Sequence, residues 1–255
     1  NGGGVSSNGN QTYNGAVTLG QDTTLTGTNV TLASGSSMAG AGHSLDVVGN
    51  AIISADVSNV SVANVSGTTR LGANVSTTGS QSYAGAMTVA TDARLVASGA
   101  SAVITAGGTI DALASGGQAL TMNATGAGGR VVLNNAVGNA TALSQLSINT
   151  GTVTMNAGTV RTTGNQTYGG AMTLARDTLL SASGSGSTVV VSGEINGDGV
   201  AARSLNISDV AGAVNLGAAV GSVTRLSTVE VTAGTIGLNG GGVSSNGNQT
   251  YNGAV

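Results

Sequence analysis

Apolar residues recur at every second position over short runs along the whole chain. These i, i+2 pairs are Val17 and Leu19, Val60 and Val62, Leu146 and Ile148, Val153 and Met155, Leu205 and Ile207, Val229 and Val231, and Ile236 and Leu238. A period of two places both members of a pair on one face of a β-strand, with the intervening Thr, Ser, Asn or Gly facing water. The i, i+3, i+4 spacing of an amphipathic helix is nearly absent. The pattern therefore predicts many short strands.

Clusters of Gly, Asn and Ser separate these runs, for example NGGG, ASGSS, TGAGG and SGSGS. Such residues supply the positive φ angles and the local side-chain hydrogen bonds of tight turns. Strands of roughly three to five residues, separated by turns, indicate a coiled chain rather than one wide sheet.

The sequence repeats at two levels. The stretch NGGGVSSNGNQTYNGAV at 1–17 returns letter for letter at 239–255, an offset of 238 residues. A shorter motif begins at Asn10 (NQTYNGAVTL), Ser80 (SQSYAGAMTV), Asn165 (NQTYGGAMTL) and Asn248 (NQTYNGAV), and it contains all four tyrosines. The motif spacings are 70, 85 and 83 residues, which together make the 238-residue offset.

These repeats predict one continuous domain over 1–255. A super-repeat occupies 1–238, the next copy starts at 239, and the modules run approximately over 10–79, 80–164, 165–247 and 248–255. A window cut from a longer array explains this arrangement, and an artificial duplication of one end is the alternative. Repetition at such periods is typical of solenoids, propellers and other arrays.

Composition selects among these architectures. The 255 residues include 44 Gly but no Pro, Cys, Phe or Trp, and the hydrophobic fraction of 40% comes mainly from small and aliphatic residues. Sandwiches, barrels and propellers close on themselves and usually rely on larger core residues. A β-solenoid stacks each coil on the previous one around a narrow core. We therefore expect an all-β parallel β-helix of about 11–12 coils without caps, in which 238 residues span on the order of 55 Å.

The motif also carries a family resemblance. The run NQTYNGAVTLGQDTTLTG, its relatives from Ser80 and Asn165, and the segment LTMNATGAGGRVVLNNAVGNATALSQLSI from Leu120 resemble the repeats of filamentous-haemagglutinin-like proteins. Those proteins are adhesins that Gram-negative bacteria export by two-partner secretion. The resemblance covers essentially the whole chain. It implies a right-handed coil that serves as the shaft of a fibrous adhesin, at the cell surface or in the biofilm matrix.

An uncapped solenoid exposes strand edges at both ends, so we expect the isolated chain to associate with other copies end to end or laterally, or to fray. Extracellular polysaccharide is the partner that the alternative binding function would require. A net charge of −3 without a basic cluster argues against nucleic-acid binding. No stretch approaches the ~20 apolar residues of a membrane span, and no signal peptide opens the sequence. The absence of Cys excludes disulfides and thiolate metal sites.

Few residues offer catalytic or metal-binding chemistry. The only histidine, His43, has one nearby carboxylate, Asp46, so we expect a turn or surface histidine rather than a ligand or a catalytic base. Glu194 and Asp198 in GEINGDGV could pair, and NGDG resembles a calcium turn. The repeated G-G-x-G-x-D sequence that would support calcium binding is missing, although a calcium ion at this turn stays an open alternative. We therefore predict no enzyme activity and no catalytic, cofactor or metal residue.

The remaining charged residues have structural interpretations. Asp22, Asp92 and Asp177 each follow the motif glutamine by 11 residues, and we expect them to accept backbone N–H groups in turns. Asp92 with Arg94, and Arg176 with Asp177, are expected to form solvated surface pairs of little energetic value.

Three polar residue types recur often enough to carry predictions of their own. We expect the motif tyrosines to share one angular position, three or four coils apart, as amphipathic cover over a column end or bend. Their role is either packing or carbohydrate stacking. Stacked Asn side chains can form ladders along the axis. Thr24, Thr26 and Thr28 alternate as on a flat binding face for polysaccharide or ice, the alternative function, but such rows do not persist from coil to coil.

Overall fold

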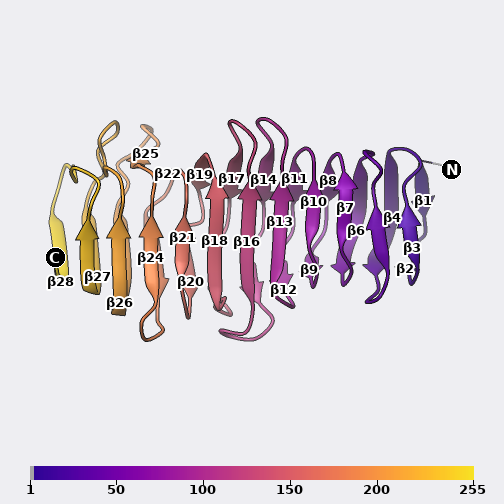
Figure 1. The fold of residues 1–255 in the computed structure, drawn as a ribbon, viewed down its shortest axis with the longest axis horizontal. Helices are drawn as coiled ribbons and strands as arrows, with labels where there is room; N and C mark the ends of the chain where they lie inside the picture. The colour runs from indigo at the N-terminus through magenta and orange to yellow at the C-terminus, as the bar shows by residue number, and fades with distance from the viewer. Residues whose placement is uncertain (1–2) are drawn as a thin grey trace.

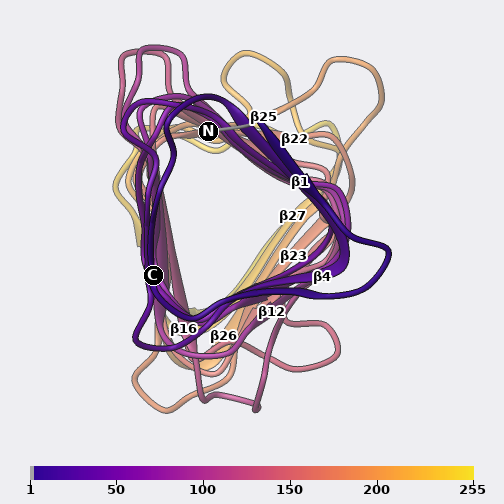
Figure 2. The same ribbon diagram turned by 90° about the vertical axis from the view of Figure 1, so that its right-hand side faces the viewer.

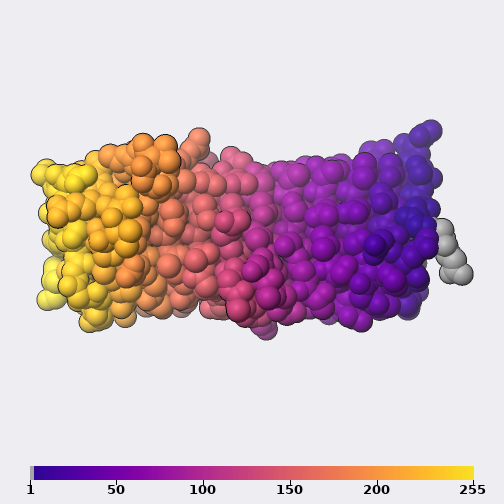
Figure 3. Space-filling view, turned by 90° about the horizontal axis from the view of Figure 1, so that it is seen from above, coloured from indigo at the N-terminus to yellow at the C-terminus, as the bar shows by residue number. Residues whose placement is uncertain are grey.

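The computed structural model describes residues 3–255 and contains 28 strands and no helix in that range. The chain winds into a three-sided column of stacked coils, a β-solenoid of about 11 turns. The three sides enclose a triangular cross-section, and the space-filling view shows an uninterrupted rod (Figures 2 and 3). We call the sides face I, face II and face III, in the order in which the chain first crosses them.

Each face is a stack of parallel strands. Face I contains β1 (Gly4–Ser6), the first half of β4 (Thr23–Leu32), the first half of β6 (Leu45–Ile53), β8 (Ala63–Val65), β11 (Gln81–Tyr83), β14 (Val103–Ala106), β17 (Arg130–Leu133), β19 (Thr152–Met155), β22 (Ala171–Leu174) and β25 (Ile195–Gly197). Single bridges at Val220 and Val243 continue it.

Face II follows face I around the triangle. It contains β2 (Gln11–Tyr13), the second halves of β4 and β6, β9 (Thr69–Leu71), β12 (Met87–Val89), β15 (Ile110–Ala112), a bridge at Val137, β20 (Thr159–Thr162), β23 (Thr178–Ala182), the first halves of β26 (Leu205–Leu216) and β27 (Val229–Leu238), and the start of β28 (Gln249–Ala254).

Face III completes each coil. It contains β3 (Ala16–Thr18), β5 (Ser37–Ala39), β7 (Val57–Val60), β10 (Val75–Thr77), β13 (Ala93–Ala97), β16 (Ala119–Ala124), β18 (Gln145–Thr150), β21 (Gln166–Tyr168), β24 (Thr188–Val191), the second halves of β26 and β27, and the end of β28.

The hand of the coil is visible from the N-terminal end of the rod. There the chain runs clockwise, from β1 through β4 to β16, while it recedes from the viewer (Figure 2). The solenoid is therefore right-handed, as the family resemblance implied.

The core is a narrow column of small and aliphatic side chains. Inward positions alternate with outward ones along each strand, and residues such as Leu146, Ile148, Val153 and Met155 are fully buried. This confirms the alternation predicted from the sequence, with three exceptions. Val17 is half-buried in β3, which pairs only with β5 in the described range. Val62 is only half-buried, because it lies in the corner between the end of β7 at Val60 and the start of β8 at Ala63. Leu238 is 38% exposed, because it lies beyond the last residue of β27 that β28 covers.

The Gln-x-Tyr motif lies on a different face in each module. Gln11–Tyr13 is on face II, Gln81–Tyr83 on face I and Gln166–Tyr168 on face III, and Gln249–Tyr251 returns to face II. The expectation of one shared angular position is therefore wrong. From one motif to the next the chain crosses eleven sides, which is three full turns plus two sides. Since eleven is not a multiple of three, three modules are needed to restore the original face.

One glycine column shows how closely the coils approach each other. Gly27, Gly49, Gly67 and Gly85 lie one above another at the edge between faces I and II, in the turn before face II. A Cβ on Gly85 would lie 2.5 Å from the Gly67 carbonyl oxygen, which is closer than a side chain can approach. The backbones therefore touch at this edge, and only glycine fits there.

Candidate functional site

The motif glutamine and tyrosine form the most extensive polar network inside the column. Tyr83 donates from its hydroxyl to Gln81 Oε1 at 2.9 Å. Gln81 Nε2 faces the Val75 carbonyl at 3.2 Å and the Val96 carbonyl at 2.7 Å. Val75 lies in β10 on face III, just before the corner that leads to Gln81, and Val96 lies in β13 on face III of the next coil. The side-chain amide of Gln81 therefore joins two successive coils. A third contact, to Thr77 Oγ1, measures 3.2 Å.

The third module repeats this network on another face. Tyr168 donates to Gln166 Oε1 at 2.9 Å, and Gln166 Nε2 donates to the Ser181 carbonyl at 2.8 Å. Both residues are fully buried. A buried glutamine is tolerated only when its donors and acceptor are paired, and here each is.

Burial also decides what the tyrosines can do. Tyr83 and Tyr168 are 1% and 0% exposed, and desolvation raises the pKa of each hydroxyl far above its usual range. The packing role is confirmed for these two residues. Carbohydrate stacking and a position over a column end or bend are both wrong for them, because they lie inside the rod.

The end copies of the network are more open. Gln11 keeps both backbone contacts, to Val5 and Thr26, but Tyr13 is only half-buried. Gln249 keeps the contact to Val243 at 3.1 Å and is exposed.

The recurring aspartates join successive coils at the corners. Asp22 Oδ1 accepts the N–H of Ser44 at 2.8 Å, Asp92 that of Ala119 at 2.9 Å and Asp177 that of Ser204 at 2.9 Å. These bonds confirm the predicted role as acceptors of backbone N–H groups. At Asp22 the bond from Ser44 is the main reason that the carboxyl pKa lies below its ordinary value.

Asparagine ladders also form as predicted. Asn29 Nδ2 donates to Asn10 Oδ1 at 2.9 Å, and Asn50 Nδ2 donates to Asn29 Oδ1 at 3.3 Å, so three successive coils are joined. A second such pair links Asn156 to Asn134 at 2.8 Å. The side-chain amides of these asparagines are therefore hydrogen-bonded to neighbouring coils of the same rod.

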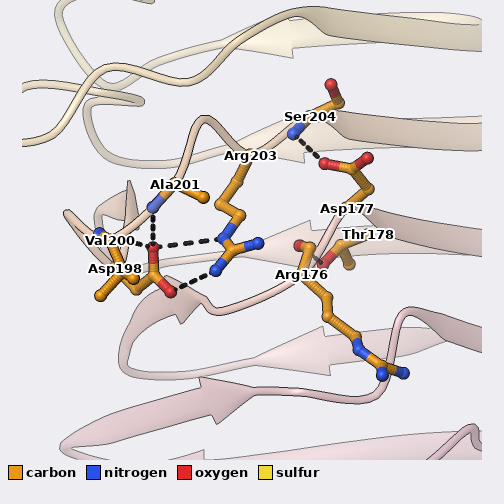
Figure 4. A network of polar contacts seen from close by, with 8 residues as sticks. All are labelled: Arg176, Asp177, Thr178, Asp198, Val200, Ala201, Arg203 and Ser204. Carbon is orange, nitrogen blue, oxygen red and sulfur yellow. Dashed lines mark hydrogen bonds and ion pairs between the residues drawn. The ribbon is translucent and has the colours of Figure 1, made fainter.

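Asp198 is held by an arginine instead of by Glu194. Arg203 Nη2 lies 2.6 Å from Asp198 Oδ2, and Arg203 Nε lies 3.2 Å from Oδ1 (Figure 4). The N–H groups of Val200 and Ala201 also point at Oδ1. These contacts, with the Arg203 hydrogen bonds the largest cause, lower the pKa of Asp198 to about 2. Glu194 instead accepts from Ser222 Oγ at 3.3 Å.

The two expected surface pairs do not form. Within residues 3–255 Arg203 and Asp198 form an ion pair, and His43 Nδ1 lies 3.7 Å from Asp22 Oδ1. Figure 4 shows Arg176 directed away from the Asp177 carboxylate, which instead accepts the Ser204 N–H. Asp92 is likewise engaged with a backbone N–H, so the predicted pairs with Arg94 and Arg176 are wrong.

His43 lies at a corner, as predicted, but its neighbour differs from the expected one. Its Nδ1 faces Asp22, whereas Asp46 accepts from Asn64 Nδ2 at 2.7 Å. The side chain is 37% exposed. Across residues 3–255 no group of three His, Cys, Asp or Glu side chains converges as a metal site would require.

One buried carboxyl was not anticipated from the sequence. Asp209 is fully buried at the edge between faces II and III, and its Oδ1 accepts from Ser187 Oγ at 2.6 Å. Its Oδ2 has no partner. Burial raises the pKa of this carboxyl, and the Ser187 hydrogen bond opposes that effect.

The candidate binding face of threonines does not continue along the rod. Thr24 is followed on face I by Asp46, Asn64 and Ser82 in successive coils, and Thr26 is followed by Val48. Cavities are equally uninformative about ligands. An apolar space near Leu32 and Tyr83 holds only ≈ 20 Å³, about one water.

Comparisons with known proteins add no further assignment. No family model, no curated protein and no solved structure matches the chain. No helix in the described range could cross a membrane. The geometry of the described residues is therefore that of a β-solenoid whose recurring polar residues bind neighbouring coils of the same rod.

Proposed function

We propose that this chain is a structural shaft that provides reach and rigidity within a larger fibrous protein. The observation that carries the proposal is the junction at 238/239. Residues 239–255, which repeat the sequence of 1–17, are stacked on the preceding coil with Gln249 in register with Val229. Gln249–Tyr251 occupies the same face as Gln11–Tyr13, so one super-repeat passes into the next without a change of direction.

The chemistry of the rod supports the same proposal. The recurring Gln, Asp and Asn side chains are hydrogen-bonded to adjacent coils, and Tyr83 and Tyr168 are hydrogen-bonded to the glutamine of their own motif. The resemblance to filamentous-haemagglutinin-like repeats supplies a setting for the shaft: a secreted adhesin at a bacterial surface or in a biofilm matrix. We assign no catalytic role to the segment, and the threonine positions give no specific support to a polysaccharide- or ice-binding role.

Polypeptides with one, two and three super-repeats test the proposal. A rigid shaft lengthens by eleven coils per super-repeat, on the order of 53 Å, because parallel strands stack at ~4.8 Å. Electron microscopy and small-angle X-ray scattering measure this increment. Bent or compact particles whose maximum dimension fails to grow in proportion to repeat number would refute a shaft.

A further inference from the structure

Ser187 and Asp209 form a buried hydrogen-bond chain at the edge between faces II and III. Ser187 Oγ lies 2.6 Å from the Gly184 carbonyl oxygen and 2.6 Å from Asp209 Oδ1. Both distances are those of hydrogen bonds between oxygen atoms. A carbonyl oxygen and an ionised carboxylate can only accept, whereas a serine hydroxyl has a single hydrogen to donate. Ser187 therefore cannot donate to both of these oxygens at once.

A proton on Asp209 completes this chain. The carboxylic acid O–H then donates to Ser187 Oγ, and the Ser187 O–H donates to the Gly184 carbonyl. If the carboxyl is ionised, one of the two acceptors is left without a hydrogen, and a buried acceptor without a donor is destabilising. The number of available hydrogens therefore favours the neutral acid.

The surroundings offer an ionised Asp209 no compensating charge. The residue is 0% exposed, and its Oδ2 has no hydrogen-bond partner among the described residues. The connection at 183–187 and the strands β23 and β24 contain no titratable residue, and β26 contains only Asp209 itself. In β27 the titratable residue is Glu230, which is exposed and accepts from Asn206 Nδ2 at 3.1 Å. Burial is the largest effect on the Asp209 carboxyl and raises its pKa, in agreement with the hydrogen-bond chain.

The second module shows that such a corner does not require a carboxyl. In positions 85 residues earlier, Ala102 and Ala124 stand in place of Ser187 and Asp209, and both alanines are buried. Two small apolar side chains therefore suffice to pack a corner of this kind. The hydroxyl and carboxyl in the third module add a contact that depends on a proton.

We propose that Asp209 is held as a neutral carboxylic acid that donates to Ser187, and that the corner at 209–213 opens locally when this acid ionises. Ionisation transfers the acid proton to solvent water and leaves the electron pair on the carboxylate. Opening of the corner hydrates that carboxylate, which is otherwise buried without a counter-charge. The inference goes beyond the proposed shaft, because it assigns a proton-binding site and a pH-dependent conformational change to one of its corners.

An NMR titration of the full chain tests the protonation directly. We expect the side-chain carboxyl carbon of Asp209 to titrate well above the ordinary aspartate pKa of about 4. An Asp209 signal that titrates at or below about 4 would overturn the proposal without the need for any variant.

Native-state hydrogen exchange measures the opening, with the second module as the reference. The Ala213 N–H donates to the Ser187 carbonyl at 3.0 Å, and the Arg130 N–H makes the matching bond to the Ala102 carbonyl at 3.0 Å. After correction for intrinsic exchange rates, the ratio of the two protection factors compares both corners within one molecule. A raised pKa contributes stability that is fully present below about pH 4 and is lost as the pH rises through the folded-state pKa. We therefore expect the Ala213/Arg130 ratio to fall about tenfold for each pH unit by which that pKa exceeds about 4, and then to level off.

Asp209→Asn is the matched variant, because its amide can donate to Ser187 Oγ at every pH. We expect its Ala213/Arg130 ratio to be independent of pH. Ser187→Ala removes the acceptor of the acid proton, so we expect the ratio at about pH 4 to fall below the wild-type value. A wild-type ratio that does not change with pH, or one that changes equally in Asp209→Asn, would overturn the proposal.

Circular dichroism of each variant shows whether the coil is intact. If Asp209→Asn fails to fold, the double variant Ser187→Ala/Asp209→Ala takes its place, because it reproduces the buried alanine pair of the second module. The double variant has no acid at this corner, so its ratio is also expected to be independent of pH.

Discussion

Replacing Tyr168 with Phe isolates one hydrogen bond of the buried network. The substitution removes only the hydroxyl that donates to Gln166 Oε1 at 2.9 Å, and it leaves the aromatic ring in the core. Gln166 Nε2 keeps its bond to Ser181, but Oε1 is left without its donor in a position that water does not reach. The change therefore tests whether the hydrogen bond of Tyr168 stabilises the rod, or whether only the packing of its aromatic ring does.

The magnitude follows from burial. An unpaired polar atom in the interior costs about 1–3 kcal/mol, so we expect the free energy of unfolding to fall by that amount. Tyr13→Phe is the matched control, because the same bond to Gln11 exists there at 2.8 Å but the side chain is only half-buried. Water can replace that donor, and we expect a loss of about 0.5 kcal/mol or less.

Two measurements are needed, because repeat arrays often unfold in more than one step. Urea denaturation followed by circular dichroism gives the overall change. Native-state hydrogen exchange locates it, and we expect faster exchange near Tyr168, including the Ser192 N–H that donates to the Tyr168 carbonyl. Equal losses in Tyr168→Phe and Tyr13→Phe, or no loss in either, would refute the reasoning from burial.

Three further substitutions test the corners. Gly85→Ala should lower the unfolding free energy by about 3 kcal/mol, because the new methyl group meets the Gly67 carbonyl, whereas Gly15→Ala, with open space around it, should change the urea midpoint little. Burial raises the pKa of Asp209, so the contribution of this carboxyl to stability should be largest below about pH 4 and should be lost as the pH rises through the raised pKa. Asp209→Asn should remove this decline, and urea midpoints that differ equally between pH 4 and pH 7 in both proteins would contradict it. Arg203→Ala should raise the Asp198 pKa from about 2 towards its ordinary value, as an NMR titration of that carboxyl would show, and an unchanged pKa would rule out the guanidinium as its main cause.

The fold was predictable because its determinants are local and repeated. Alternation such as Leu146–Ser147–Ile148 defines an inward and an outward side within three residues, and the glycine-rich turns mark the corners. A composition without Phe or Trp requires a thin core, which a solenoid provides. The hand of the coil came from the resemblance alone, since strand alternation is the same in either hand.

The placement of the motif could not be read from its spacing. Modules of 70, 85 and 83 residues differ in length but not in the number of sides crossed, because the extra residues lie in corner loops such as 113–118 and 198–203. The number of residues between two motifs therefore does not reveal the number of sides crossed, which determines the face on which the next motif lies. Counting the short inward runs between successive tyrosines would have revealed it.

Long-range polar partners were also hidden. Gln81 and Tyr83 recur together at i, i+2, which places both on one face, and this signal identifies the pair as inward once the tyrosine is known to be buried. The Val96 carbonyl that completes the network lies in the next coil, and because it is a backbone group, no sequence pattern identifies it as the partner of Gln81. Asp209 was missed for a related reason, because nothing distinguishes its carboxylate from those of solvent-exposed turns.

The mismatch between eleven sides and a triangular cross-section constrains how such a protein can vary in length. Gain or loss of one module would rotate the part of the rod beyond it by two-thirds of a revolution about the long axis, and it would also change the length of the rod. Gain or loss of all three would alter the span alone. Recombination between the identical 17-residue stretches at 1–17 and 239–255 would therefore change the length of the rod by whole super-repeats and leave the angular positions of its faces unchanged.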